Sequence, residues 1–222
     1  MIYELVRWIH IGAGAVGLLS LGVPLASRKG GTVHVRSGRV YAYAMGLSAA
    51  TGAVVAAVKI PDPATRDGGL FLLFVAVLAA MTTVHGLRAI HHKARKGPVM
   101  GAPEMALPAL LLVAGVAMAG WGLARGVVLF AAFGVLGMFL GGGALRWWSR
   151  APKPKEWLNE HIGGMLGSGI GTVTAFLVVN AHRLDLGLPT WLVWMAPTFV
   201  GVPAILAWQR SVRPKLGVAR GA

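Results

Sequence analysis

The segment WIHIGAGAVGLLSLGVPLA, residues 8–26, contains the pattern G-x-G-x-x-G at Gly12, Gly14 and Gly17. In dinucleotide-binding folds this pattern follows a buried strand and precedes an acidic residue about 20 positions further on. Here the preceding segment, MIYELVRWIH, is short and polar at its start, and residues 27–39 contain no carboxylate. We therefore reject NAD as a cofactor. The apolar run 5–26 is long enough to cross a bilayer, which takes about 20 residues, and it predicts a membrane helix.

The composition of the whole chain supports the same interpretation. Of the 222 residues, 56% are hydrophobic and only 13% are charged, and the mean hydropathy is +0.68. A soluble domain has about 25% charged residues. The chain contains no cysteine, which excludes disulfides and thiolate metal sites. The length favours one integral membrane domain covering residues 1–222.

Seven apolar windows are long enough to be transmembrane spans. In lipid only helices and closed barrels satisfy every backbone polar group, and these windows lack the alternation of barrel strands. We therefore predict an all-α polytopic membrane bundle of seven transmembrane helices. The predicted spans are 5–26, 40–58, 70–90, 103–123, 126–145, 158–180 and 189–208.

The placement of the basic residues predicts the orientation of this bundle. The chain has 21 Lys and Arg and a net charge of +14. Sixteen of the 21 lie in segments 28–39, 88–96, 146–155 and 210–220, which alternate with the segments that hold the others. Because Lys and Arg accumulate on the cytoplasmic side, we expect the N-terminus outside and the C-terminus cytoplasmic, in a bacterial inner membrane. We therefore expect the net positive charge to bind anionic membrane lipids, and we expect no nucleic-acid partner.

Ionisable residues inside the spans are functional candidates. The spans 103–123 and 126–145 have none in their apolar stretches and are predicted to be scaffold, with Gly134, Gly137 and Gly141 allowing close helix contact. The span 189–208 contains no lysine, which excludes a retinal Schiff base. Histidines instead mark the first, third and sixth spans, at His10, His85 and His161.

His85 and His161 are predicted to lie at a similar depth. At 1.5 Å per helical residue they are about 7 and about 5 Å inside the same, cytoplasmic boundary. Met81 and Met165 lie one turn deeper, each on the face of its histidine. If the two rings share a ligand, their nitrogens should be roughly 4–7 Å apart.

Imidazole and thioether groups suit haem iron or copper, and imidazole with a carboxylate suits zinc. The predicted set for haem b or another cofactor is His10, His85, His161, Met81 and Met165. The predicted set for a metal ion, copper or zinc, is His34, His85, His161 and Glu160.

Two glycine faces would let a backbone or a flat porphyrin approach: Gly14 and Gly17 beside His10, and the stripe Gly163, Gly167 and Gly171. A plainer interpretation stays open for all these residues: methionine fills cores, glycine packs helices, and a buried histidine is simply hydrogen-bonded.

The segment HVRSGRVYAYAMGLSAATG, residues 34–52, contains the motif His-x3-Gly-Arg-x-Tyr at His34, Gly38, Arg39 and Tyr41. With a first helix that carries a histidine, it resembles an uncharacterised family of bacterial multi-helix predicted membrane proteins over about the first 90 residues. The resemblance implies a multi-helix bacterial membrane protein and brings no established activity with it.

Three function classes fit the sequence. We favour a haem- or metal-binding redox protein that passes electrons between a membrane quinone and a partner protein. A metal-dependent intramembrane lipid hydrolase is the first alternative, although no H-E-x-x-H motif is present. A non-enzymatic transporter or assembly subunit is the second, although the spans are poor in the Asp and Glu of cation-coupled transport.

Overall fold

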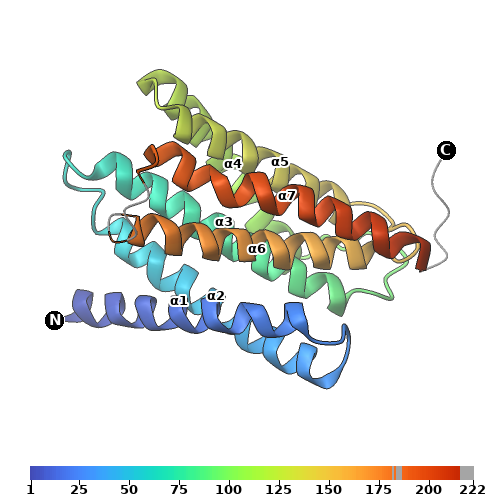
Figure 1. The fold of residues 1–222 in the computed structure, drawn as a ribbon. Helices are drawn as coiled ribbons and strands as arrows, with labels where there is room; N and C mark the ends of the chain where they lie inside the picture. The colour runs from blue at the N-terminus through green and yellow to red at the C-terminus, as the bar shows by residue number, and fades with distance from the viewer. Residues whose placement is uncertain (182, 184–186, 216–222) are drawn as a thin grey trace. The chain divides into compact units, whose positions relative to one another are not determined.

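The computed structural model describes residues 1–181, 183 and 187–215, and in this part the chain is all-α (Figure 1). Each of its seven helices is long and apolar enough to cross a membrane, so the chain is a multi-pass membrane protein. The helices are α1 (Ile2–Ala26), α2 (Thr32–Ala57), α3 (Arg66–His91), α4 (Ala102–Arg125), α5 (Val128–Trp148), α6 (Glu156–Asn180) and α7 (Thr190–Lys215). One helix corresponds to each predicted span.

The helices are divided between two compact units. The first contains Met1–Met81 and Gly97–Ala151, and therefore α1, α2, α4, α5 and the first part of α3. The second contains Thr82–Lys96 and Pro152–Ala222, and therefore the last part of α3 with α6 and α7. The boundary falls within α3, so one continuous helix contributes to both units.

In the first unit, α1 and α2 form a hairpin whose tight turn uses Gly30 at φ +75°, a left-handed conformation that favours glycine. The glycine face of α1 packs onto α2. A Cβ atom on Gly17 would lie 2.9 Å from Met45 Sδ, and one on Gly14 would lie 3.7 Å from Ser48 Oγ. Gly14 and Gly17 therefore serve helix packing against α2, whereas nothing lies within 4 Å of a Cβ on Gly12. A porphyrin beside His10 stays a prediction.

The start of α2 corrects the sequence prediction. The helix begins at Thr32 and not at residue 40, so His34 and the basic residues Arg36 and Arg39 lie on the helix and not in a loop. The predicted span left out residues 32–39 because the polar residues among them lower the mean hydropathy of any window that includes them. Their long side chains reach the interface while the backbone stays helical.

The close contacts predicted for three glycines of α5 are present. A Cβ on Gly141 would lie 2.7 Å from the backbone of Leu112, one on Gly134 would meet the backbone of Ala119, and one on Gly137 would lie 2.7 Å from the Phe74 ring. Only glycine allows this approach. The fifth span does not start at residue 126, because Gly126 adopts φ 67° and ends α4 as its C-cap.

In the second unit, α6 packs on α7 and on the last part of α3. A Cβ on Gly164 would lie 2.6 Å from Gly86 Cα, so the two helix backbones touch at this point. The predicted stripe of Gly163, Gly167 and Gly171 does not make this contact. Its nearest neighbours lie at 3.5 Å for Gly163 and 3.9 Å for Gly167, and none lies within 4 Å for Gly171. The expectation of close packing at the stripe was therefore wrong.

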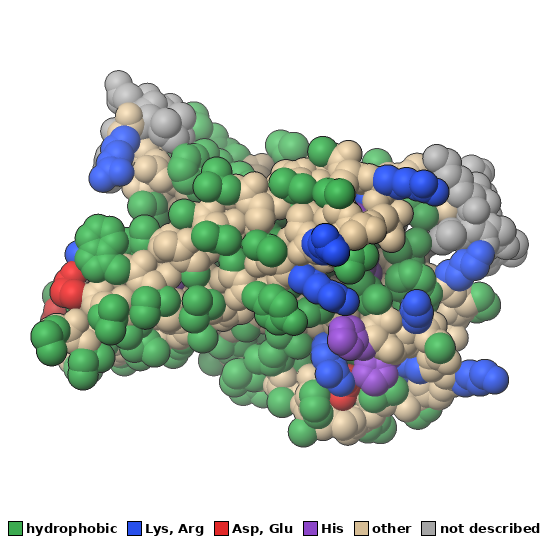
Figure 2. All heavy atoms as spheres, turned by 90° about the horizontal axis from the view of Figure 1, so that it is seen from below, with side chains coloured by type: hydrophobic (Ala, Val, Ile, Leu, Met, Phe, Trp, Pro, Cys, Tyr) green, Lys and Arg blue, Asp and Glu red, His purple; other side chains and the backbone are tan. Residues whose placement is uncertain are grey.

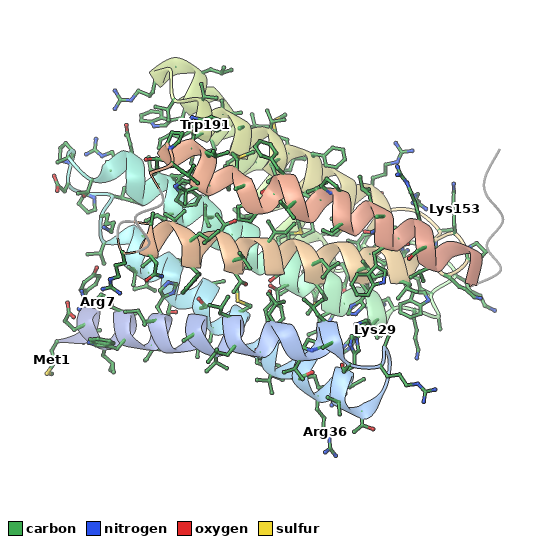
Figure 3. The ribbon with its side chains drawn as sticks, in the orientation of Figure 1. Met1, Arg7, Lys29, Arg36, Lys153 and Trp191 are labelled. Atoms are coloured by element: carbon green, nitrogen blue, oxygen red, sulfur yellow. The ribbon has the colours of Figure 1, made fainter. Side chains whose placement is uncertain are left out.

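The side chains match a chain surrounded by lipid. Hydrophobic groups spread over the face shown in Figure 2, whereas Lys, Arg and His occur in restricted patches. In Figure 3, Lys29 and Arg36 lie at one end of the α1–α2 hairpin, and Met1 and Arg7 lie at the other. The side of the membrane that each end faces stays a prediction. His182, interpreted as a solvated loop residue, and the tail residue Arg220 lie outside the described residues.

Candidate functional site

His85 lies on the last part of α3 and contacts α6. Its Nε2 atom is 2.9 Å from Glu160 Oε2. The histidine side chain is 8% exposed and the glutamate side chain 29% exposed, so the pair is shielded from bulk solvent on the histidine side. The ring N–H donates to the carboxylate, and the contact becomes an ion pair when the ring is protonated. We predicted both residues as site candidates, and the structure places them in direct contact.

His161 makes the reciprocal contact from α6 to α3. Its Nδ1 donates to the backbone carbonyl of Gly86 at 3.0 Å. A carbonyl only accepts, so Nδ1 carries the hydrogen, and in the neutral ring the lone pair is on Nε2. The close approach of Gly86 and Gly164 makes this contact possible. His85 and His161 therefore lie at one α3–α6 interface, whereas their equal depth in a membrane and a ligand shared between them stay predictions.

The next turn of the same interface is polar as well. Thr83 Oγ1 and Ser168 Oγ are 2.7 Å apart, and both residues are buried. Ser168 also accepts, through its backbone carbonyl, the hydroxyl of Thr172 at 3.0 Å. Hydroxyls satisfied within the helix pair need no water, so this segment of α3 and α6 carries polar groups at low cost in lipid.

His10 lies on α1 in the first unit and contacts α2. Its Nδ1 is 2.9 Å from the backbone carbonyl of Ser48, to which it donates, and the hydroxyls of Ser48 and Thr51 lie 3.4 Å from the same nitrogen. The ring lies against Gly52, where a Cβ would be 2.9 Å from His10 Cε1. The bond fixes the tautomer and the missing side chain at Gly52 leaves room for the ring.

His34 sits in the first turn of α2 and donates from Nδ1 to the carbonyl of Pro24 at 3.0 Å. Lys29 Nζ donates to the same oxygen at 2.8 Å. Pro24 belongs to the last turn of α1, where carbonyls have no partner within the helix. Burial lowers the pKa of Lys29 from its ordinary value. Tyr41, two turns after His34 and on the same face of α2, is 1% exposed.

One arrangement recurs at His10, His34 and His161. Each ring donates Nδ1–H to a backbone carbonyl of a neighbouring helix, which leaves Nε2 as the nitrogen with the lone pair in the neutral ring. Histidines that bind metals are oriented in this way, because the second hydrogen bond fixes the tautomer and raises the basicity of the ligating nitrogen.

The described residues contain no group of three or more His, Asp and Glu side chains that is placed to hold a metal ion. The role of His34, His85, His161 and Glu160 as metal ligands stays a prediction, and the only two of these residues shown in direct contact among the described residues are His85 and Glu160. The same holds for the methionines. Met81 is buried at 3% exposure, and Met165 is half-buried.

Two features were missed from the sequence. Glu104, in the first turn of α4, is 4% exposed, and its Oε2 lies 3.1 Å from the place of a Cβ on Gly101. A glutamate in the first turn is favoured by the positive end of the helix dipole. Its place three residues after the N-cap Gly101 is the sequence signal that could have identified it. The second is a contact between basic residues, in which Arg88 Nη2 donates to His92 Nε2 at 3.2 Å.

No protein-family model, no curated protein and no solved structure matches this chain. The fold and the contacts described above therefore define the class, a multi-pass α-helical membrane protein with histidines hydrogen-bonded between its helices. The resemblance carried by the His-x3-Gly-Arg-x-Tyr motif stays a prediction.

Proposed function

We propose that this protein is a membrane redox protein that holds haem b, or alternatively a copper ion, through histidine Nε2 atoms. The observation that carries the proposal is the repeated Nδ1–H to carbonyl bond at His10, His34 and His161. A histidine that only fills space has no need of one particular tautomer. A ligand does, because only the unprotonated nitrogen binds the metal.

Haem fits a chain that is poor in acidic residues. The chain has seven Asp and Glu in total and no cysteine, whereas haem iron takes neutral imidazoles and needs no carboxylate. The bound group would supply one-electron chemistry. The protein's own residues would orient the rings, exclude water and keep each Nδ1 protonated. In this proposal electrons pass between a membrane quinone and a partner protein, in the bacterial inner membrane.

The His85–Glu160 contact supports a second candidate, in which the protein relays protons. His85 Nε2 is hydrogen-bonded to the Glu160 carboxylate and is therefore not oriented toward a metal as the Nε2 atoms of the other candidate ligands are proposed to be. Histidine changes its charge near neutral pH, and an intramembrane His–Glu pair is suited to proton movement. The two candidates are compatible if electron transfer at the haem or copper changes the protonation of His85 or Glu160.

Cofactor content tests the proposal. The protein is purified from cells supplied with a haem precursor, iron and copper, and its haem is measured as the pyridine haemochrome beside metal analysis of the same sample. We expect stoichiometric haem b, or stoichiometric copper without haem. Zinc alone would favour the hydrolase alternative. Absence of all three at stoichiometric level would overturn the redox proposal.

A further inference from the structure

The chain at the end of α3 concentrates basic side chains. Six of the nine residues 88–96 are Lys, Arg or His. Arg88 and His91 belong to the last turn of α3, and the next residues remain close to the helix end because the Lys93 and Arg95 amides donate to the carbonyls of Ile90 and His92, at 3.2 and 3.0 Å. Positive charge is therefore concentrated at the C-terminal end of this apolar helix, whereas its first turn carries Arg66 beside Asp67.

Arg88 and His92 contact each other within this group. Arg88 Nη2 donates to His92 Nε2 at 3.2 Å, which requires His92 to be neutral because a protonated ring accepts no hydrogen bond. Arg88, His92 and Arg95 are half-buried, so their charge is less screened than at an open surface. Burial, and then the positive charges of Arg88, Arg95 and His91, lower the pKa of His92.

The helix dipole explains only part of this pattern. Cations stabilise the C-terminal end of a helix, but the effect is confined to the last turn. Lys93, Arg95 and Lys96 follow the last residue of α3 and lie beyond that range. A grouped positive charge at the level where an apolar span ends matches the phosphates of the lipid headgroups instead.

We propose that Arg88, His92 and Arg95 form a binding site for the phosphate of an anionic phospholipid. Each guanidinium presents paired donors that fit a phosphate, and the hydrogen bond to His92 helps to hold the Arg88 guanidinium in place. The source is a bilayer lipid and not free phosphate, because the site lies at the end of a membrane-spanning helix. Exposed Lys93 and Lys96 add attraction without fixed geometry.

The test measures lipid retained by the full-length protein in nanodiscs of phosphatidylcholine with one fifth phosphatidylglycerol. The lipid bound after mild delipidation is quantified by mass spectrometry. We expect enrichment of phosphatidylglycerol by the natural protein and loss of most of it, several-fold, in the double variant Arg88→Gln/Arg95→Gln. Arg88→Lys should retain part of it, because it keeps the charge and loses the paired donors.

The matched control is Arg36→Gln/Arg39→Gln, which removes the same charge from exposed positions on α2. If this control loses as much phosphatidylglycerol as Arg88→Gln/Arg95→Gln, the lipid is held by general electrostatic attraction only, and the proposed site is wrong. Displacement of the lipid by millimolar inorganic phosphate would assign the site to a free anion and would overturn the lipid source. Far-ultraviolet circular dichroism of each variant checks the helices, and a variant that has lost helix is replaced by the single change Arg95→Gln.

Discussion

At the scale of single residues, the chain shows how imidazoles are held within helices that lipid surrounds. The sequence identified His10, His85 and His161 because each interrupts an apolar stretch. It could not identify their partners. The oxygen bonded to His161 lies 75 residues away in the sequence and the one bonded to His10 lies 38 away, and both belong to backbone groups that every residue carries. A bond of this kind depends on the distance between two helices and on their rotation.

The first prediction concerns the titration of His92. Burial, Arg88, Arg95 and His91 lower its pKa in the folded protein, whereas in the unfolded chain the ring titrates near its ordinary value of about 6.5. The unfolded state therefore binds more protons between these two pKa values. Stability should be complete above the unfolded pKa and should fall as the pH decreases through that value toward the folded pKa.

Nuclear magnetic resonance of ring-labelled histidine would show the His92 signal titrating below the ordinary histidine value of about 6.5. The variant His92→Gln should remove the corresponding part of the pH dependence of thermal unfolding in detergent. A His92 titration at or above this ordinary value would contradict the assigned cause.

At the scale of helices, the sequence predicted how many there are and roughly where, because apolar length is a local property. It did not predict which face of a helix packs. The glycine spacing on α6 pointed to Gly163, Gly167 and Gly171, but the close contact is made by Gly164 against Gly86. A helix that contains many small residues has several such faces, and only the partner helix selects one.

The second prediction uses this difference. Gly164→Ala should destabilise the protein by about 1–3 kcal/mol, the usual cost of overpacking, because its Cβ would lie 2.6 Å from Gly86 Cα and backbone cannot move aside cheaply. It should also disturb the bond from His161 to Gly86. Gly171→Ala is the matched control, since no atom lies within 4 Å of its Cβ position. Unfolding in a detergent titration measures both, and equal stabilities would contradict the packing at Gly164.

At the scale of the whole molecule, the number of crossings and the charges between them predict orientation. The structure shows Lys29 and Arg36 at one end of the α1–α2 hairpin and Arg7 at the other, as the alternation of basic segments requires (Figure 3). Charge bias at the ends of each span decides which end stays in the cytoplasm.

The third prediction is this topology. A reporter fused after Ala222 should be cytoplasmic, and one inserted at Asp62, in the connection between α2 and α3, should be periplasmic. Alkaline phosphatase and green fluorescent protein fusions report the two sides in opposite ways, so each site is tested twice. A periplasmic C-terminal reporter would contradict the predicted orientation.

The reduced-minus-oxidised visible spectrum of the purified protein tests the redox proposal most directly. We predict a haem b difference band in the natural protein that is lost or shifted in at least one of His10→Ala, His34→Ala and His161→Ala, because each removes an oriented Nε2. His91→Ala is the control and should leave the band unchanged, since this ring is exposed at the end of α3. A natural protein with no difference band, or a band that all three variants keep, would contradict haem ligation by these histidines.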